Sequence, residues 1–123
     1  MKKILVVDDD VAILDLMKRI LERDGYQVMV ASTGEQCLEI LDHNPDKSIE
    51  MIFLDLKMPG MGGEDALARI RERDASIPVV VISGYGTFED KVRLFKKEVR
   101  RFVTKPFNVD FIRMLAKNTL PGK

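Results

Sequence analysis

The chain has 123 residues, 46% of them hydrophobic and 33% charged, and its 20 basic and 20 acidic side chains give a formal net charge of +0. This composition excludes a disordered chain and is typical of one soluble globular domain. It gives no indication that this domain binds nucleic acid or a membrane. No apolar stretch approaches the roughly 20 residues that span a bilayer, and the single cysteine, Cys37, excludes an internal disulfide. We therefore expect a cytoplasmic location.

The first expected strand is the apolar run Lys3–Val7, which ends in the acids Asp8-Asp9-Asp10. Apolar residues then recur at helical spacing from Ile13 to Leu21, and the helix should stop at Asp24-Gly25. Either Asp9 or Asp10 is suited to cap this helix, and for Asp10 a cap is the better interpretation than a ligand.

The rest of the chain continues the same alternation of strand-like and helix-like segments. We expect a strand at residues 26–31, a helix opened by Ser32 or Thr33, a strand at 51–55, a helix through Leu67 and Ile70, a strand at 78–82, a helix with Phe88, Val92, Phe95 and Val99 on one face, a strand at 101–104, and a last helix capped by Asn108. Five strands alternating with five helices predict an α/β fold, with one doubly wound parallel sheet covered on both faces. We expect this domain to span residues 1–120, with 121–123 as a tail or the start of a linker.

Asp55 ends the central strand, directly after four apolar residues, and the chain turns at Pro59-Gly60. Open α/β sheets bind ligands at the carboxyl ends of their strands, so an acid there is well placed for chemistry. A strand-terminal Asp is, however, more often a turn former or a helix cap. The functional interpretation of Asp55 therefore depends on the residues at the ends of the other strands.

Three other strands end in polar groups, namely Asp8-Asp9, Ser83 and Lys105. All four strand ends should lie along one edge of the sheet. Crowded carboxylates repel one another unless a cation neutralises them, and hard oxygen ligands suit Mg²⁺. With an ammonium and a hydroxyl beside them, these carboxylates form a set suited to receiving a transferring phosphoryl group.

These residues resemble the receiver domain of the response-regulator family, the phosphoacceptor half of two-component signalling. The resemblance covers essentially the whole chain and rests on four motifs: Val-Val-Asp8-Asp9-Asp10, Leu54-Asp55-Leu-Lys-Met-Pro59-Gly-Met-Gly-Gly63, Val81-Ile-Ser83-Gly84 and Phe102-Val-Thr-Lys105-Pro106-Phe107. It implies a flavodoxin-like sheet with strand order 2-1-3-4-5. It also implies a signalling receiver that takes a phosphoryl group from a sensor histidine kinase or phosphotransfer protein. Such a receiver catalyses its own phosphorylation and dephosphorylation and is otherwise not an enzyme.

The resemblance also implies a role for each acid. Asp55 matches the phosphorylated residue. Asp9 and Asp55 match side-chain ligands of Mg²⁺, with the backbone carbonyl of Lys57 as a further ligand. Asp8 matches an acid that acts mostly through metal-bound water.

The remaining motifs imply a conformational switch. Ser83 matches the hydroxyl that contacts the phosphoryl group, Lys105 the lysine beside it, and Phe102 the aromatic ring whose rotation reports activation. We expect Ser83 and Phe102 to be neighbours at the active edge, and Phe102 to sample its inward position even without phosphate. We expect a cis peptide bond between Lys105 and Pro106. An output partner, or an effector domain missing here, should read the fourth helix, fifth strand and fifth helix.

The chain departs from the family pattern at the turn before the fifth strand. Family members commonly carry a Gly-Ala pair where this chain has Glu98-Val99, which puts that turn in question. Lys57 and Tyr85 occupy positions that vary in the family and tune dephosphorylation. The nearby basic residues Lys91, Arg93, Lys96, Lys97, Arg100 and Arg101 form a solvated face by default, with a surface for an acidic partner as the alternative.

Two other functions fit part of the sequence. A small phosphohydrolase would also use an aspartyl phosphate, but Lys57 stands where such an enzyme would carry a second acid, two residues after Asp55. An interaction module that no longer takes phosphate would not need the complete set of acids with Ser83 and Lys105. Cys37 is expected to pack in its helix and His43 to be solvated.

Overall fold

The computed structural model describes residues 2–44, 48–58, 60–84, 93 and 98–120. The strands are β1 (Lys3–Val7), β2 (Gln27–Ala31), β3 (Ile49–Asp55), β4 (Val79–Ser83) and β5 (Arg101–Thr104). The helices within these residues are α1 (Val11–Arg23), α2 (Gly34–Asp42), α3 (Gly63–Arg73) and α5 (Val109–Thr119).

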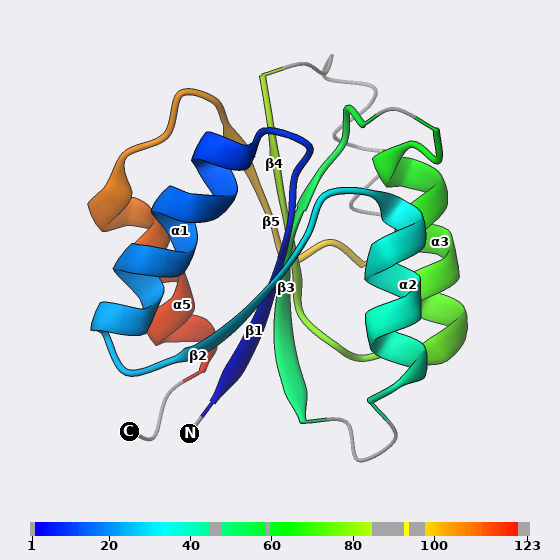
Figure 1. The fold of residues 1–123 in the computed structure, drawn as a ribbon, viewed down its shortest axis with the longest axis horizontal. Coiled ribbons are helices and arrows are strands. Elements are labelled where there is room, and N and C mark those ends of the chain that lie inside the picture. The colour runs from blue at the N-terminus through cyan, green and yellow to red at the C-terminus, as the bar shows by residue number, and fades with distance from the viewer. Residues whose placement is uncertain (1, 45–47, 59, 85–92, 94–97, 121–123) are drawn as a thin grey trace.

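The five strands form one parallel sheet in the order β2-β1-β3-β4-β5, as the sequence predicted. α1 and α5 cover one face of the sheet, and α2 and α3 cover the other (Figure 1). α1 follows β1 on one face of the sheet, α2 and α3 then follow β2 and β3 on the other face, and α5 after β5 returns to the first. The chain thus forms a three-layer α/β arrangement in which both faces of the sheet are buried.

Each face of the sheet has its own hydrophobic core, because successive side chains of a strand point to opposite faces. On the side of α1 and α5, Phe53 of β3 packs with Met17, Leu21 and Ile112. The α2 and α3 side contains Leu54, the next residue of β3, with residues such as Leu38, Leu67 and Ile70. The central strands are buried on both faces, which explains their continuous apolar sequences.

Side-chain caps begin three of the helices where the sequence places them. The carboxylate of Asp10 accepts a hydrogen bond from the Ala12 N–H at 3.0 Å, and the hydroxyl of Thr33 accepts one from Gln36 at 3.0 Å. The side-chain oxygen of Asn108 accepts one from the Asp110 N–H at 2.8 Å. Such caps satisfy backbone donors that have no partner inside the helix. The expectation that Asp10 caps α1 is therefore confirmed.

The expected fourth helix can be compared with the structure only at Arg93, which is helical, and at its expected end. Phe88, Val92 and Phe95 lie outside the described residues, whereas Val99 is buried but lies in the segment before β5 and not in a helix. The described part of the chain accordingly contains four helices where we expected five. None of the helices in this part is long and apolar enough to cross a membrane.

The Glu98-Val99 pair forms the turn into β5 in an uncommon way. Glu98 has a φ of +63°, in the left-handed region that favours glycine, and it is the one non-glycine residue with positive φ among the described residues. The departure from the family pattern therefore does affect the turn, because a glutamate occupies a backbone conformation that favours glycine.

Candidate functional site

The predicted site residues come together at the carboxyl edge of the sheet, the upper edge in Figure 1. Asp55 is the last residue of β3 and Ser83 the last of β4, while Asp8 follows β1 and Lys105 follows β5. Asp8 and Asp55 are each 3% exposed and Ser83 is fully buried. The parallel register aligns these ends, because Val7 pairs with Leu54 and Asp55 with Ile82.

Three carboxylates lie close together at this edge. Asp8, Asp9 and Asp55 each offer an oxygen, and these oxygens are all within 4.8 Å of one another. Two backbone groups also approach the buried acids. The Asp10 N–H donates to Asp8 Oδ1 at 2.9 Å, and the Lys57 N–H approaches Asp55 Oδ1 at 3.4 Å. Asp9, in contrast, is exposed and faces the opening of the site.

Lys105 supplies a positive charge to these acids. Its Nζ lies 2.9 Å from Asp8 Oδ2 and 3.6 Å from Asp55 Oδ2. Burial by itself would lower the pKa of Lys105, but the hydrogen bond to Asp8 and the charge of Asp55 outweigh burial and raise it. The Lys105-Pro106 peptide bond is cis, as expected.

The surroundings of Asp55 disfavour its charged form and raise its pKa. Burial, followed by the negative charge of Asp8, raises the pKa of Asp55 to about 6, although Lys105 and the Lys57 N–H oppose the shift. A further positive charge would relieve this repulsion. Several carboxylate oxygens beside an open, water-accessible space are the donors that suit Mg²⁺, so the residues present fit that ion.

The site is open to solvent. A pocket of about 750 Å³ is lined by Asp9, Asp10, Asp55, Lys57, Gly84 and Lys105. The residue two positions after Asp55 is Lys57, which is exposed and lines this pocket, so no second acid stands at that position. Asp55 thus lies at the wall of an open pocket, with Lys105 beside it.

Gly63 contributes to the site in a way that the sequence analysis did not identify. Its N–H donates to the Leu56 carbonyl at 2.9 Å, and a Cβ at this position would collide with the backbone oxygen of Asp55. The loop after β3 can therefore fold back onto Asp55 only because residue 63 has no side chain. The three glycines among residues 60–63 were the available signal, but the sequence does not show which glycine makes the close approach.

Ser83 and Phe102 are not adjacent in the way we expected. In the register of β4 and β5, Thr104 pairs with Ser83, whereas Phe102 pairs with Val81. Phe102 therefore lies two pairs further from the active edge than Ser83, because the pair of Ile82 and Val103 stands between them. Residues two apart along a strand share a face, so Ser83 and the half-buried Phe102 remain diagonal neighbours on the α3 side.

The other residues discussed from the sequence have surroundings that suit a structural role. Burial raises the pKa of Cys37 to about 12, which fits packing and not redox chemistry. His43 is exposed, with its Nδ1 2.8 Å from the Glu39 carbonyl at the end of α2.

In the basic group before and at the start of β5, Arg93 contacts Glu64 through two nitrogens at 2.6 and 2.9 Å. The guanidinium of Arg101 lies over the ring of Phe111 at 5.3 Å, while Lys91, Lys96 and Lys97 lie outside the described residues.

Known proteins share both the sequence and the fold. Residues 4–117 match the family model of the response regulator receiver domain. The transcriptional regulatory protein CpxR of Escherichia coli (strain K12) is 38% identical over 108 residues, which cover 88% of this chain and 44% of CpxR. This chain thus spans less than half the length of that relative. The sporulation initiation phosphotransferase F of Bacillus subtilis (strain 168) is 34% identical over 123 residues, covering 99% of this chain and 96% of that protein.

The solved structures agree with this relationship. The crystal structure of a response regulator receiver domain protein from Clostridium thermocellum has a TM-score of 0.89 and 30% sequence identity, covering 97% of this chain and 94% of that one. The strand order and the position of the acidic edge in this chain are consistent with that fold. The chain therefore belongs to the response regulator receiver domain family of two-component phosphorelay signalling.

Proposed function

We propose that this chain is a phosphorylation-controlled receiver whose phosphoacceptor is Asp55. The donor is a phosphohistidine on a sensor histidine kinase or a phosphotransfer protein. One carboxylate oxygen of Asp55 forms a bond to phosphorus while the bond between phosphorus and the histidine nitrogen breaks. The imidazole leaves with the bonding electrons and takes up a proton. The observation that carries this proposal is a buried Asp55 carboxylate that faces an open pocket 3.6 Å from the Lys105 ammonium.

Two side chains of this chain would stabilise the transferred group. The Lys105 ammonium, held by Asp8, lies where it can neutralise charge on the phosphoryl oxygens. Ser83 ends the neighbouring strand and presents a hydroxyl donor at the same edge. Both are carried on strand ends, so little reorganisation is needed during transfer.

Mg²⁺ is the cofactor that the donor set fits. Asp9, Asp55 and the backbone carbonyl of Lys57 would hold it, with Asp8 acting through a bound water. When bound, the ion supplies positive charge that offsets the repulsion among the carboxylates and the incoming phosphate. The raised pKa of Asp55 supports this assignment, since burial and the negative charge of Asp8 together outweigh the effect of Lys105 and disfavour the charged carboxylate.

Signalling would then follow from movement of Ser83 and Phe102. A phosphoryl group on Asp55 adds anionic oxygens that need donors, and the Ser83 hydroxyl moves toward them. The space vacated on the α3 side of the sheet admits the Phe102 ring. The surface that changes, formed by β5, α5 and the segment before β5, would be read by an output partner or an attached effector domain.

The relatives differ in whether a receiver domain makes up most of the protein or only part of it. One of them, a sporulation initiation phosphotransferase, is matched along 96% of its length, whereas the CpxR relative is matched along 44%. We therefore propose residues 1–120 as a complete receiver unit, active either alone in a phosphorelay or joined to an effector.

The direct test is incubation with acetyl phosphate and Mg²⁺, followed by intact-mass measurement. We expect one phosphoryl adduct on the wild type, none on Asp55→Asn, and a strong reduction when EDTA replaces Mg²⁺. Asp15→Asn is a matched control, because it removes an exposed carboxylate that does not line the pocket and should leave the adduct unchanged.

Other outcomes would select other functions. Rapid multiple turnover of small phosphomonoesters would favour a phosphohydrolase. A wild-type protein without an adduct under any of these conditions would leave an interaction module that keeps only the fold. An adduct that survives Asp55→Asn would show that another residue is the acceptor.

A further inference from the structure

The turn before β5 is held in an unfavourable backbone conformation. A non-glycine residue in the left-handed region costs free energy, because its Cβ crowds the following carbonyl oxygen. Glu98 pays this cost with a φ of +63° on an exposed turn. Such a conformation persists only when surrounding contacts hold it, so the turn needs an external support.

Arg71 of α3 provides that support. Its Nη2 donates to the Glu98 carbonyl at 2.8 Å, across 27 positions of sequence. The Nη1 donates to the Ile77 carbonyl at 2.7 Å and lies 3.4 Å from the Asp74 carbonyl. One planar guanidinium therefore joins the backbone before β4 to the backbone before β5. A lysine cannot reproduce this arrangement, because it has a single nitrogen.

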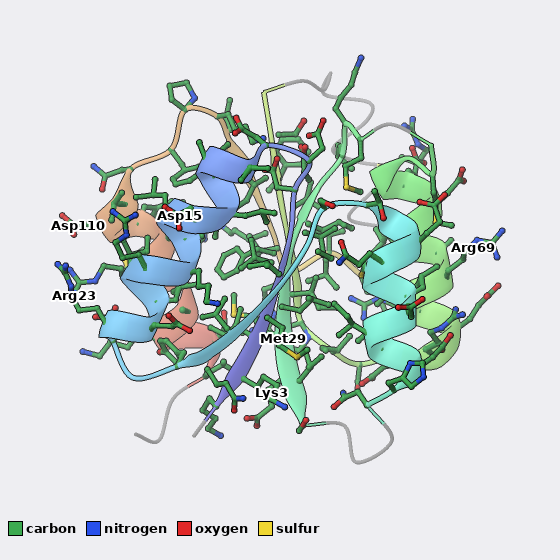
Figure 2. All side chains as sticks on the ribbon, in the orientation of Figure 1. Lys3, Asp15, Arg23, Met29, Arg69 and Asp110 are labelled. Carbon is green, nitrogen blue, oxygen red and sulfur yellow. The ribbon has the colours of Figure 1, made fainter. Side chains whose placement is uncertain are left out.

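The neighbouring arginines of α3 are placed differently. Arg69 projects from α3 into solvent (Figure 2), and Arg73 pairs with the Asp42 carboxylate of α2 at 2.6 Å. Arg71 is instead half-buried, and burial lowers its pKa although the nearby Glu98 and Asp74 oppose the shift. A guanidinium is desolvated at a cost, and here three carbonyl acceptors offset that cost.

The supported turn leads directly to Phe102. Val99, next to Glu98, is 5% exposed and belongs to the core on the α3 side. The Arg100 N–H then donates to the Val79 carbonyl at 2.8 Å and begins the pairing of β5 with β4. The Phe102 ring packs against the same core as Val99. The position of the turn thus sets where β5 starts and how much room the ring has.

We propose that Arg71 is a positioning residue that fixes the Glu98 turn and thereby sets the rotational preference of Phe102. Its effect on signalling rests on the proposed function, whereas its effect on the turn does not. Without Arg71 the turn relaxes, the amino end of β5 loosens, and the balance between the inward and outward positions of the ring changes in the unphosphorylated protein.

Hydrogen exchange tests the first part. In Arg71→Lys we expect the Arg100 amide to exchange about tenfold faster, the factor expected for losing roughly one net hydrogen bond. Arg69→Lys makes the same chemical change on the exposed face of α3 and should leave this amide unchanged. Ile112→Val, in α5 across the sheet, controls for a general loss of stability. The lysine variant keeps charge and stem, so it should fold even if Arg71→Ala does not.

A second substitution separates positioning from general stability. Glu98→Gly adopts the left-handed conformation without strain, so the turn should no longer need its support. In the Glu98→Gly background, Arg71→Lys should change the logarithm of the Arg100 exchange rate by less than about half of the change that it causes in the wild-type background. Equal effects in both backgrounds would overturn the proposal.

Aromatic NMR of Phe102 completes the test. We expect Arg71→Lys to shift or broaden the ring signals without phosphate, and Glu98→Gly to restore them. Unchanged ring signals together with faster exchange would refute the link to Phe102. If wild-type Asp55 takes no phosphate, the proposed function fails while the exchange and ring measurements still decide the role of Arg71.

Discussion

Replacing Asp55 by asparagine should make the protein more stable at neutral pH. The native carboxylate is 3% exposed and lies beside Asp8, so its pKa is raised to about 6 from 3.8. Between these values the native state holds a proton that the unfolded chain releases. Stability is therefore lost as pH rises through this window, and the loss is complete above about pH 6. Asparagine has a similar shape and carries no charge, so it does not incur this loss of stability.

The size of the effect follows from the shift. A difference of about two pKa units corresponds to about 3 kcal/mol at neutral pH. The same linkage gives a penalty of about 1 kcal/mol at pH 4.5, where the native carboxyl is mostly protonated. Asparagine also loses the attraction of Lys105 and adds amide hydrogens, so we expect a gain of about 2 kcal/mol at pH 7.5.

Urea denaturation of both proteins in EDTA at pH 4.5, 6.0 and 7.5 measures this gain. The stability difference should shrink as pH falls, and adding Mg²⁺ at pH 7.5 should stabilise the wild type more than Asp55→Asn. Asp15→Asn, which breaks an exposed pair with Arg19, should change stability by less than about 0.5 kcal/mol. A variant no more stable than wild type at pH 7.5, or a gain that is the same at every pH, would refute the reasoning.

Three further predictions test individual contacts. Asp9→Ala should weaken Mg²⁺ binding more than Asp10→Ala, because the Asp9 carboxylate faces the site while that of Asp10 caps α1; equal losses in a Mg²⁺ titration would contradict this. Gly63→Ala should lower the free energy of unfolding by about 1–3 kcal/mol, since its methyl group meets the Asp55 backbone, and an unchanged urea midpoint would count against that contact. Asn108→Ala should cost about 1 kcal/mol through loss of the α5 cap, seen as a lower thermal midpoint, and full stability would show the cap to be dispensable.

Much of the fold was predictable because its signals are local. The strands at Lys3–Val7 and Arg101–Thr104 begin and end where the sequence places them. Apolar runs predict strands buried on both faces, and helical spacing predicts the helices between them. Asp10 and Asn108 cap helices because short polar side chains reach backbone donors only two or three residues away.

The members of the candidate site were predictable for a related reason. The carboxyl ends of parallel strands meet at one edge, so the residues that end the strands must gather there. The sequence therefore indicates that Asp8, Asp9, Asp55, Ser83 and Lys105 belong together. It also shows that this edge carries carboxylates, an ammonium and a hydroxyl, which are groups that suit a divalent cation and an anionic ligand.

Tertiary structure decided how these residues meet. Lys105 lies closer to Asp8 than to Asp55, Thr104 and not Phe102 pairs with Ser83, and Gly63 touches the Asp55 backbone. The support of Glu98 by Arg71 joins residues 27 positions apart. Strand register and helix packing fix these distances through many contacts between remote segments, whereas sequence patterns report only what neighbouring residues prefer. For this reason the sequence determined which groups form the site, and packing determined their geometry.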